Sequence, residues 1–174
     1  MEYFILFAIS LALAALIARN IYIGITSAPF AASRKKIIRR ALRLAKLKPN
    51  EKFYDLGSGD GRVLIVADKE FNALATGFEL SWQWYLISKI KIFLSGATHA
   101  RVFCKDFRTT TLRDADVIFS WLTQKAMEPL EKKLAEELKP GARVVIFSSH
   151  LPSWKSEEMF AFSDTARLFL YIKK

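Results

Sequence analysis

Hydrophobic residues follow three different patterns along this chain. From residue 3 to residue 25 they are nearly continuous. From 34 to 47 they recur at helical spacing, with basic residues between them. From residue 52 onward, short apolar runs alternate with longer amphipathic ones. The pattern therefore predicts three parts: an N-terminal apolar segment (1–25), a linker with a basic helix (26–49) and an α/β domain (50–174).

The N-terminal segment is predicted to be a single transmembrane anchor. Tyr3 to Ile25 is 23 residues, and a helix needs about 20 to cross a bilayer. The segment is apolar on all sides, unlike a surface helix. A cleaved signal peptide is an alternative, but Glu2 stands where such a peptide carries positive charge. A buried core helix is the second alternative, and would be unusually long.

Positive charge is concentrated just after this segment. Arg34 to Lys48 holds eight basic residues and no acid, whereas Glu51 to the end holds 18 basic and 16 acidic residues. Basic residues beside an anchor favour the cytoplasmic side for the C-terminal domain and could bind anionic lipid headgroups. A solvated helix face near a membrane is the simpler explanation, and a surface for nucleic acid or an acidic partner is the alternative. A nucleic-acid-binding domain would more often spread the charge across a face of the fold, so nucleic acid is disfavoured.

Strand and helix patterns alternate regularly in the third part. Ser33 is the expected N-cap of the preceding basic helix, and Pro49-Asn50 ends that helix. Strands are expected at about 52–56, 73–79, 100–104, 115–120 and 142–148, helices at about 61–71, 82–95 and 124–138, and a hairpin at about 158–163 and 166–172. This alternation predicts a doubly wound, mostly parallel, Rossmann-like sheet with helices on both faces.

A glycine-rich turn links the first strand to its helix. Asp55 ends the apolar run, and Gly57, Ser58, Gly59 and Gly61 follow before the next apolar run. Glycine lets a ligand approach the backbone closely, and a helix N-terminus offers free N–H groups to an anionic part of that ligand. This turn is therefore the expected ligand site.

Two further acids follow neighbouring strands. Glu79 closes the second strand, where a carboxylate can accept hydrogen bonds from both hydroxyls of a ribose. Asp106 follows the third strand, where it could accept the exocyclic amino group of adenine. In a doubly wound sheet these strand ends lie together, so the pattern indicates a nucleoside with an amino-acid or anionic portion.

The glycine spacing excludes two common nucleotide sites. Position 62, where a dinucleotide motif has its third glycine, is Arg62, and the Gly-Lys-Ser/Thr ending of a P-loop is missing. A metal site is not expected, because Cys104, His99 and His150 form no cluster in the sequence. Cys104 lies within the third strand and is expected to be a small buried hydrophobe.

The segment Asp55-Leu-Gly-Ser-Gly-Asp-Gly61, with Glu79 and Asp106, resembles the first motif and later acidic positions of class I, seven-β-strand methyltransferases. The resemblance covers about residues 50–172. It implies S-adenosylmethionine as the cofactor, held by Asp55, Gly57, Ser58, Gly59, Gly61, Glu79 and Asp106. It also implies the strand order 3-2-1-4-5-7-6, with the seventh strand antiparallel.

A narrower resemblance is to small protein-lysine methyltransferases, including membrane-anchored enzymes that modify the ATP synthase c subunit or the adenine nucleotide translocase, and an archaeal relative. It rests on the hydrophobic segment, Ala28-Pro29-Phe30, the Leu130–Leu134 run and Pro152-Ser153-Trp154. The chain departs from that family at Ser81, where Asn is common, and at Ser120-Trp121-Leu122.

The resemblance implies methyl transfer to protein lysines by direct displacement, in which positioning supplies most of the rate. Asp60, Ser120, Trp121 and His150 are candidates for lining the acceptor pocket, and no general base is assigned. RNA, a lipid headgroup or a small amine is an alternative acceptor. A non-catalytic membrane module is the second alternative. An Asn/Asp-Pro-Pro-Tyr/Phe run after the fourth strand is missing, which disfavours methylation of base amines or glutamine.

Overall fold

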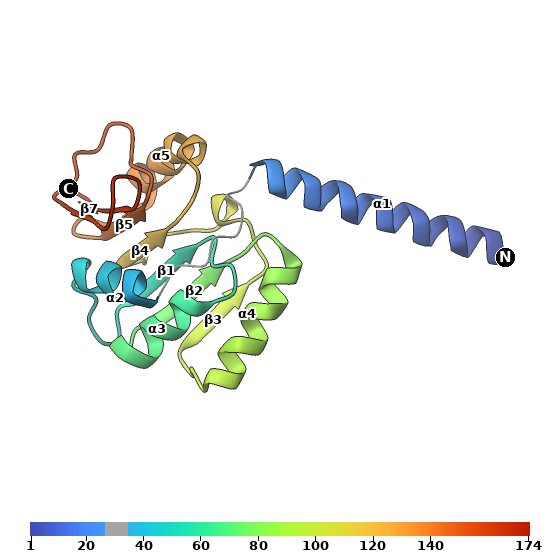
Figure 1. Ribbon diagram of the computed structural model, residues 1–174, viewed down its shortest axis with the longest axis horizontal. Coiled ribbons are helices and arrows are strands. Elements are labelled where there is room, and N and C mark those ends of the chain that lie inside the picture. Colours follow the sequence, from blue (N-terminus) through green and yellow to red (C-terminus); the bar gives the residue numbers. More distant parts are fainter. Residues whose placement is uncertain (27–34) are drawn as a thin grey trace.

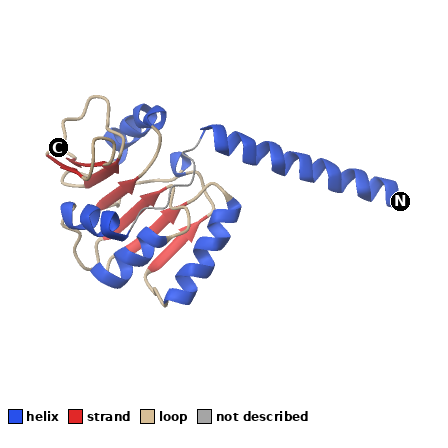
Figure 2. Ribbon diagram, viewed as in Figure 1, coloured by secondary structure: helices blue, strands red, loops and turns tan. Residues whose placement is uncertain are grey.

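A computed structural model describes residues 1–26 and 35–174 of the chain. Figure 1 shows the order of the elements, and Figure 2 separates helices from strands. The helices are α1 (Glu2–Thr26), α2 (Lys35–Leu44), α3 (Arg62–Phe71), α4 (Trp82–Ser95) and α5 (Met127–Glu137), with short 3-10 turns η1 (Phe107–Thr109) and η2 (Gln124–Ala126). The strands are β1 (Lys52–Leu56), β2 (Leu74–Phe78), β3 (Ala100–Phe103), β4 (Val117–Ser120), β5 (Arg143–Phe147), β6 (Glu158–Ala161) and β7 (Arg167–Ile172).

The seven strands form one sheet in the order β3-β2-β1-β4-β5-β7-β6. The first five are parallel, and β7 pairs antiparallel with β5 and β6. Asp55 on β1 lies opposite Gly77 on β2 and Phe119 on β4. The predicted order, the antiparallel seventh strand and the late hairpin are confirmed. The order reverses between β1 and β4, so the glycine turn lies where such sheets bind ligands.

Helices cover the two faces of this sheet unequally. Side chains of α2, α3 and α4 pack with Phe53 and Phe119 on one face, and α5 packs with Ile118 and Ile146 on the other. Alternation along the strands sends neighbouring residues to opposite faces, and each face is covered by an apolar helix stripe. No α-helix lies between β3 and β4, which are connected through the 3-10 turn η1. At the β2–β3 edge the helices α3 and α4 therefore cover one face of the sheet and leave the other without a helix (Figure 1).

Two of the basic side chains of α2 take part in packing. Arg39 makes a paired contact with Glu70 of α3, with Nε–Oε2 and NH2–Oε1 distances of 2.7 and 2.8 Å. The Arg40 guanidinium lies 4.0 Å from the ring centre of Phe160. Helix α2 is therefore attached to the rest of the domain partly through the side chains of Arg39 and Arg40. Its predicted N-cap Ser33, and Ala28-Pro29-Phe30, lie outside the described residues.

Helix α1 occupies the segment predicted to span a membrane. Within residues 1–26 and 35–174, however, no helix meets the combined requirement of length and apolarity for crossing a bilayer. The transmembrane prediction is therefore unsupported by this structure.

The prediction that Cys104 is buried is wrong. Cys104 is exposed and follows the last residue of β3, which is an edge strand. Burial alternates along β3, and the helix-free face of this edge leaves Arg101 and Phe103 exposed. An edge position with one uncovered face removes the burial that a mid-sheet strand would impose.

Arg143 connects the end of α2 to the sheet. Its NH1 donates to the carbonyls of Ala45 and Lys46, and its NH2 pairs with Glu51 at 2.5 Å. We expect Arg143→Met to lower the free energy of unfolding by about 2 kcal/mol, because it leaves these acceptors without their charged donor. Urea unfolding monitored by circular dichroism measures the change. Arg101→Met, on the exposed side of β3, is the matched control and should cost less than about 0.5 kcal/mol; equal losses would contradict this role.

Candidate functional site

The glycine turn is held mainly by backbone contacts with the end of β2. The amides of Gly57 and Ser58 both donate to the carbonyl of Phe78, at 2.9 and 3.1 Å. Gly61 has φ +76°, and a Cβ placed on it would lie 2.2 Å from Oγ of Ser88 on α4. Glycine at this position thus allows the turn to pack directly on α4, and leaves the turn's backbone in the left-handed conformation.

Glu79 fixes the turn from the end of β2. Its Oε2 accepts the amide of Gly59 at 2.8 Å, and its Oε1 accepts the amide of Ser81 at 2.8 Å. The structure thus places Glu79 against the turn, and its predicted contact with a ribose stays a prediction. One carboxylate therefore links the turn and the start of α4.

A group of buried polar atoms lies beside the turn. Asp55 is only 2% exposed, and its Oδ2 has no hydrogen-bond partner; nor do Oγ of Ser58 and Oγ of Ser120. Burial raises the pKa of Asp55 well above its ordinary value of 3.8, and the charges of Glu79 and Asp60 raise it further. Buried polar groups normally have partners, so unpaired ones indicate a ligand that supplies them. A cationic or amino donor, such as the methionine portion of S-adenosylmethionine, fits these acceptors.

Asp60 is fully engaged by two cations. Its carboxylate pairs with Arg62 (NH2–Oδ2 2.7 Å) and with Nζ of Lys91 on α4 (2.5 Å), and it is 2% exposed. Burial would raise the pKa of Asp60, but the hydrogen bonds from Arg62 and Lys91 outweigh burial and lower it. The geometry supports a role in joining the turn to α4. Its predicted place in an acceptor pocket stays a prediction.

Asp106 lies after β3, at the start of η1. Its carboxylate accepts the amide of Arg108 at 2.9 Å and pairs with that guanidinium at 2.6 Å. Burial raises the pKa of Asp106, and the hydrogen bonds from Arg108 reverse that effect and lower it. The carboxylate is thus held ionised after β3 by Arg108, and its predicted contact with adenine stays a prediction.

The loops after β4 and β5 are joined and reach the turn. Oγ of Ser149 donates to the Leu122 carbonyl at 2.8 Å, and the side chain of Gln124 bonds both backbone groups of His150. The Leu122 side chain comes within 3.2 Å of where a Cβ on Gly57 would lie. These contacts bring the loop with Ser120, Trp121 and Leu122 to the turn.

The remaining acceptor candidates differ in exposure. Ser120 is fully buried, Trp121 is partly buried with its ring 4.7 Å from that of Phe147, and His150 is exposed. Only Ser120 therefore offers a buried unpaired oxygen. The paired loops carry these three residues, and Asp60 lies on the α4 side.

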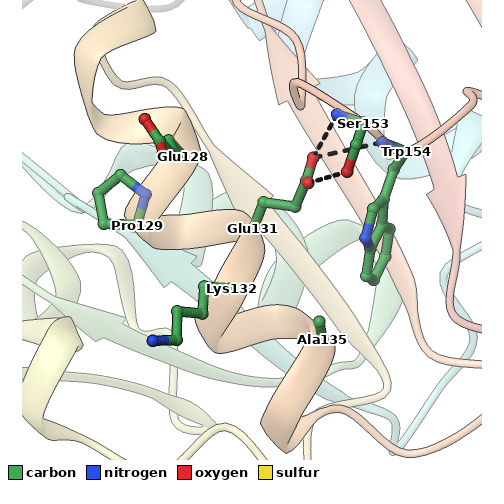
Figure 3. Close-up of a pocket in the computed structure, with 7 residues that line it drawn as sticks. All are labelled: Glu128, Pro129, Glu131, Lys132, Ala135, Ser153 and Trp154. Atoms are coloured by element: carbon green, nitrogen blue, oxygen red, sulfur yellow. Dashed lines mark hydrogen bonds between the residues drawn. The ribbon is translucent and has the colours of Figure 1, made fainter.

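A shallow cavity of about 460 Å³ lies between α5 and the loop after β5 (Figure 3). The Glu131 carboxylate accepts the amides of Ser153 and Trp154 at 2.9 and 3.3 Å, and the Ser153 hydroxyl as well. The two segments quoted for the narrower resemblance, Leu130–Leu134 and Pro152–Trp154, therefore pack together. In the described part of the chain, no three His, Cys, Asp or Glu side chains gather as metal ligands.

Sequence reasoning missed two residues that shape the site. A Cβ on Gly77 of β2 would lie 2.6 Å from Leu64 and 2.7 Å from Ser58, so this glycine lets the turn approach the strand. A glycine inside a strand is a recognisable sign of such an approach. Lys91 gives no such sign, because it lies 31 residues from Asp60 in sequence.

The buried carboxylate predicts an unusual dependence of stability on pH. Because the pKa of Asp55 is higher in the folded chain than in the unfolded one, the folded state retains a proton that the unfolded state releases above about pH 4. Stability is therefore lost as pH rises from there to the folded pKa. Asp55→Asn should remove this loss. The free energy of unfolding of the variant minus that of the natural chain should therefore increase with pH.

Urea unfolding at a series of pH values from 4 to 8, roughly the range in which a raised carboxyl pKa acts, tests this. Asp164→Asn, at an exposed carboxylate, is the control and should leave the pH dependence unchanged. Parallel curves for Asp55→Asn and the natural chain would show that Asp55 carries no raised pKa.

Comparison with known proteins agrees with the site. The sequence model of the ANTKMT methyltransferase domain matches residues 55–158, from the turn to the start of β6. A protein-lysine N-methyltransferase of Saccharolobus islandicus is 32% identical over 149 residues, which cover 83% of this chain and 92% of that protein. The mouse adenine nucleotide translocase lysine N-methyltransferase is 30% identical over 128 residues, 73% of this chain and 56% of that protein. The chain thus spans about half the length of the mouse relative.

A solved structure shares the fold. An RNA methyltransferase of Salinibacter ruber, in complex with S-adenosyl-L-homocysteine, superposes with a TM-score of 0.78 and 24% identity, covering 82% of this chain and 93% of that one. At this identity the likeness concerns the fold alone. The family match spans more than half of the chain and includes the turn built on Asp55, Gly57 and Gly59. This protein therefore belongs to the ANTKMT family of methyltransferases, which confirms the prediction of an enzyme whose cofactor is S-adenosylmethionine.

Proposed function

We propose that this protein methylates lysine side chains of protein substrates with S-adenosylmethionine as donor. One observation carries the choice of acceptor: the archaeal relative, aligned over 92% of its length, is a protein-lysine N-methyltransferase. The site supports the donor half independently, because Asp55 before the glycine turn and Ser58 within it carry buried oxygens without partners. The mouse adenine nucleotide translocase lysine N-methyltransferase aligns over 56% of its length and extends the same assignment.

The residues that would hold the cofactor lie at three adjacent strand ends. Glu79 and Asp106 would bind the ribose and the adenine, as carboxylates at these positions can. Asp55 would accept the donor's amino group, for which its unpaired Oδ2 is suited. The turn residues Gly57, Ser58, Gly59 and Gly61 would bring backbone to the ligand. When bound, S-adenosylmethionine supplies a methyl group already activated by a positively charged sulfur.

The chain's own contribution is to position and desolvate the acceptor amine. A lysine amine must be neutral to act as a nucleophile, and an apolar surrounding lowers its pKa. Trp121 and Leu122 supply apolar surface beside the turn, and the unpaired Oγ of Ser120 can accept a hydrogen bond from the amine. His150, on the joined loop, is a further candidate for contact with the acceptor. Positioning of this kind supplies most of the rate in such transfers.

We propose further that α1 attaches the enzyme to a membrane, with the C-terminal domain on the cytoplasmic side. Large apolar side chains of α1, among them Tyr3, Phe4 and Phe7, are 88%, 76% and 66% exposed, and contact with lipid would cover them. The basic residues that follow could then bind anionic headgroups.

RNA, a lipid headgroup or a small amine is the competing class of acceptor, and a fold without turnover is the third possibility. The likeness to an RNA methyltransferase concerns the fold alone and does not favour RNA. A labelled-methyl assay on membrane extract, separated into protein, RNA and lipid, distinguishes these outcomes.

We expect label in protein, recovered as methyl-lysine after hydrolysis. Glu79→Ala should lower the rate at limiting cofactor about 10- to 100-fold, because it removes charged hydrogen bonds worth about 1.5–3 kcal/mol at the site. Gly59→Arg should abolish it, and Glu136→Ala, at an exposed acid of α5, is the matched control. Label confined to RNA or lipid would overturn the lysine assignment, and cofactor binding without transfer would favour the non-catalytic alternative.

Membrane attachment predicts that the full chain sediments with membranes and resists extraction by alkaline carbonate. The double variant Ile5→Lys/Ile9→Lys should be released from membranes by alkaline carbonate, because both side chains are more than half exposed on α1 and their charge opposes contact with lipid. Lys125→Gln/Lys132→Gln is the control. A soluble natural chain would contradict the attachment.

A further inference from the structure

Helix α4 is apolar on its outer side as well as its inner side. Ser88 and Ile92 are buried toward the domain. The opposite side exposes six large apolar residues: Trp82 (40%), Leu86 (42%), Ile87 (37%), Ile90 (57%), Phe93 (83%) and Leu94 (76%). These six are called the α4 outer face. A helix that is apolar all round is normally buried on both sides, so this face requires a partner.

The charged residues of α4 itself are both basic. Residues 82–95 contain Lys89 and Lys91 and no acid. At about 100° per residue, the two lysines fall on opposite flanks of the α4 outer face. Lys89 is exposed, with Nζ 5.7 Å from the Tyr85 ring centre, and Nζ of Lys69 lies 4.0 Å from the Cβ position of Gly96, at the end of the helix. Lys91 is already paired with Asp60.

Helix α1 and a second copy of the chain are two possible partners of the α4 outer face, and both fit poorly. The described apolar side chains of α1, such as Phe4 and Phe7, are themselves exposed, so α1 does not cover this face. A second copy packed α4 against α4 would bring the flanking lysines together with no acid on the helix to pair with them. Protein interfaces are also depleted in lysine compared with the rest of a surface.

An apolar face flanked by lysines is the arrangement of helices that lie in the headgroup layer of a bilayer. Lysine stems extend along apolar surface while their ammonium groups reach the phosphates. We propose that the α4 outer face binds the surface of a membrane containing anionic lipids, with Phe93, Leu94 and Ile90 entering the acyl boundary. This contact is separate from α1 and does not depend on methyl transfer.

The contact would place the methyl-transfer site at the bilayer surface. Helix α4 starts at Trp82, and its N-cap Ser81 donates its amide to Glu79 at the glycine turn. The α4 outer face therefore begins next to the strand ends that form the site. In this orientation the methyl-transfer site could reach a substrate lysine that lies close to the membrane surface.

The test uses the full chain with Cys104→Ser, so that a single introduced cysteine carries an environment-sensitive fluorophore. Phe93→Cys reports on the α4 outer face, and Glu136→Cys on α5 is the matched control; both positions are exposed, so labelling should leave the fold intact. Vesicles are phosphatidylcholine with or without phosphatidylglycerol, and brominated acyl chains serve as quencher. Leu94→Cys provides a second labelling position on the same face, so that the test does not depend on the folding of Phe93→Cys alone.

We expect a blue shift and bromine quenching at positions 93 and 94 with anionic vesicles, and neither at 136. Lys89→Gln should lower the ratio of inserted to free label about fivefold, since one lysine at an anionic surface contributes about 1 kcal/mol, whereas Lys132→Gln should not. Equal signals at 93 and 136, while the chain floats with vesicles, would overturn the proposal. A blue shift that follows protein concentration without vesicles would assign the face to a second copy and also overturn it.

Discussion

The close packing of the glycine turn on β2 and α4 is the contact on which the rest of this structure depends. At Gly61 and Gly77 a side chain would collide with Ser88, Ser58 or Leu64. The absence of side chains there lets backbone amides reach the Phe78 carbonyl and the Glu79 carboxylate. The Asp60–Lys91 pair then joins the same turn to α4. Strand ends, turn and helix consequently form one rigid support for a ligand.

Polar atoms are buried without hydrogen-bond partners beside this turn, and binding of a ligand explains why they are tolerated. Oδ2 of Asp55 and Oγ of Ser120 are buried without partners, which destabilises a folded chain. Sites of this kind persist when a ligand pairs with the unsatisfied atoms. The joined loops after β4 and β5 supply apolar surface, with Trp121 packed on the core that includes α3 and α4 and Leu122 on the core that includes α5.

Most of the fold could be predicted from the sequence, because its pattern is local and periodic. The alternating strands and helices, the turn at Asp55–Gly61 and the acids at the next strand ends all follow from spacing of a few residues. The exposure of Cys104 could not, since it depends on β3 being an edge strand with one uncovered face. The Asp60–Lys91 pair and the contact of Glu131 with Ser153 also escaped prediction, because their partners are 31 and 22 residues apart. Chain composition alone does not fix which distant charges meet.

The central claim is that the turn beside Asp55 binds the methyl donor. Isothermal titration of S-adenosylmethionine into the full chain and into Asp55→Asn tests it most directly. We predict one site per chain in the natural protein and a dissociation constant about 10- to 100-fold higher in the variant, the loss expected for one charged hydrogen bond of about 1.5–3 kcal/mol. The absence of binding to the folded natural chain, or equal affinity in the variant, would contradict the claim.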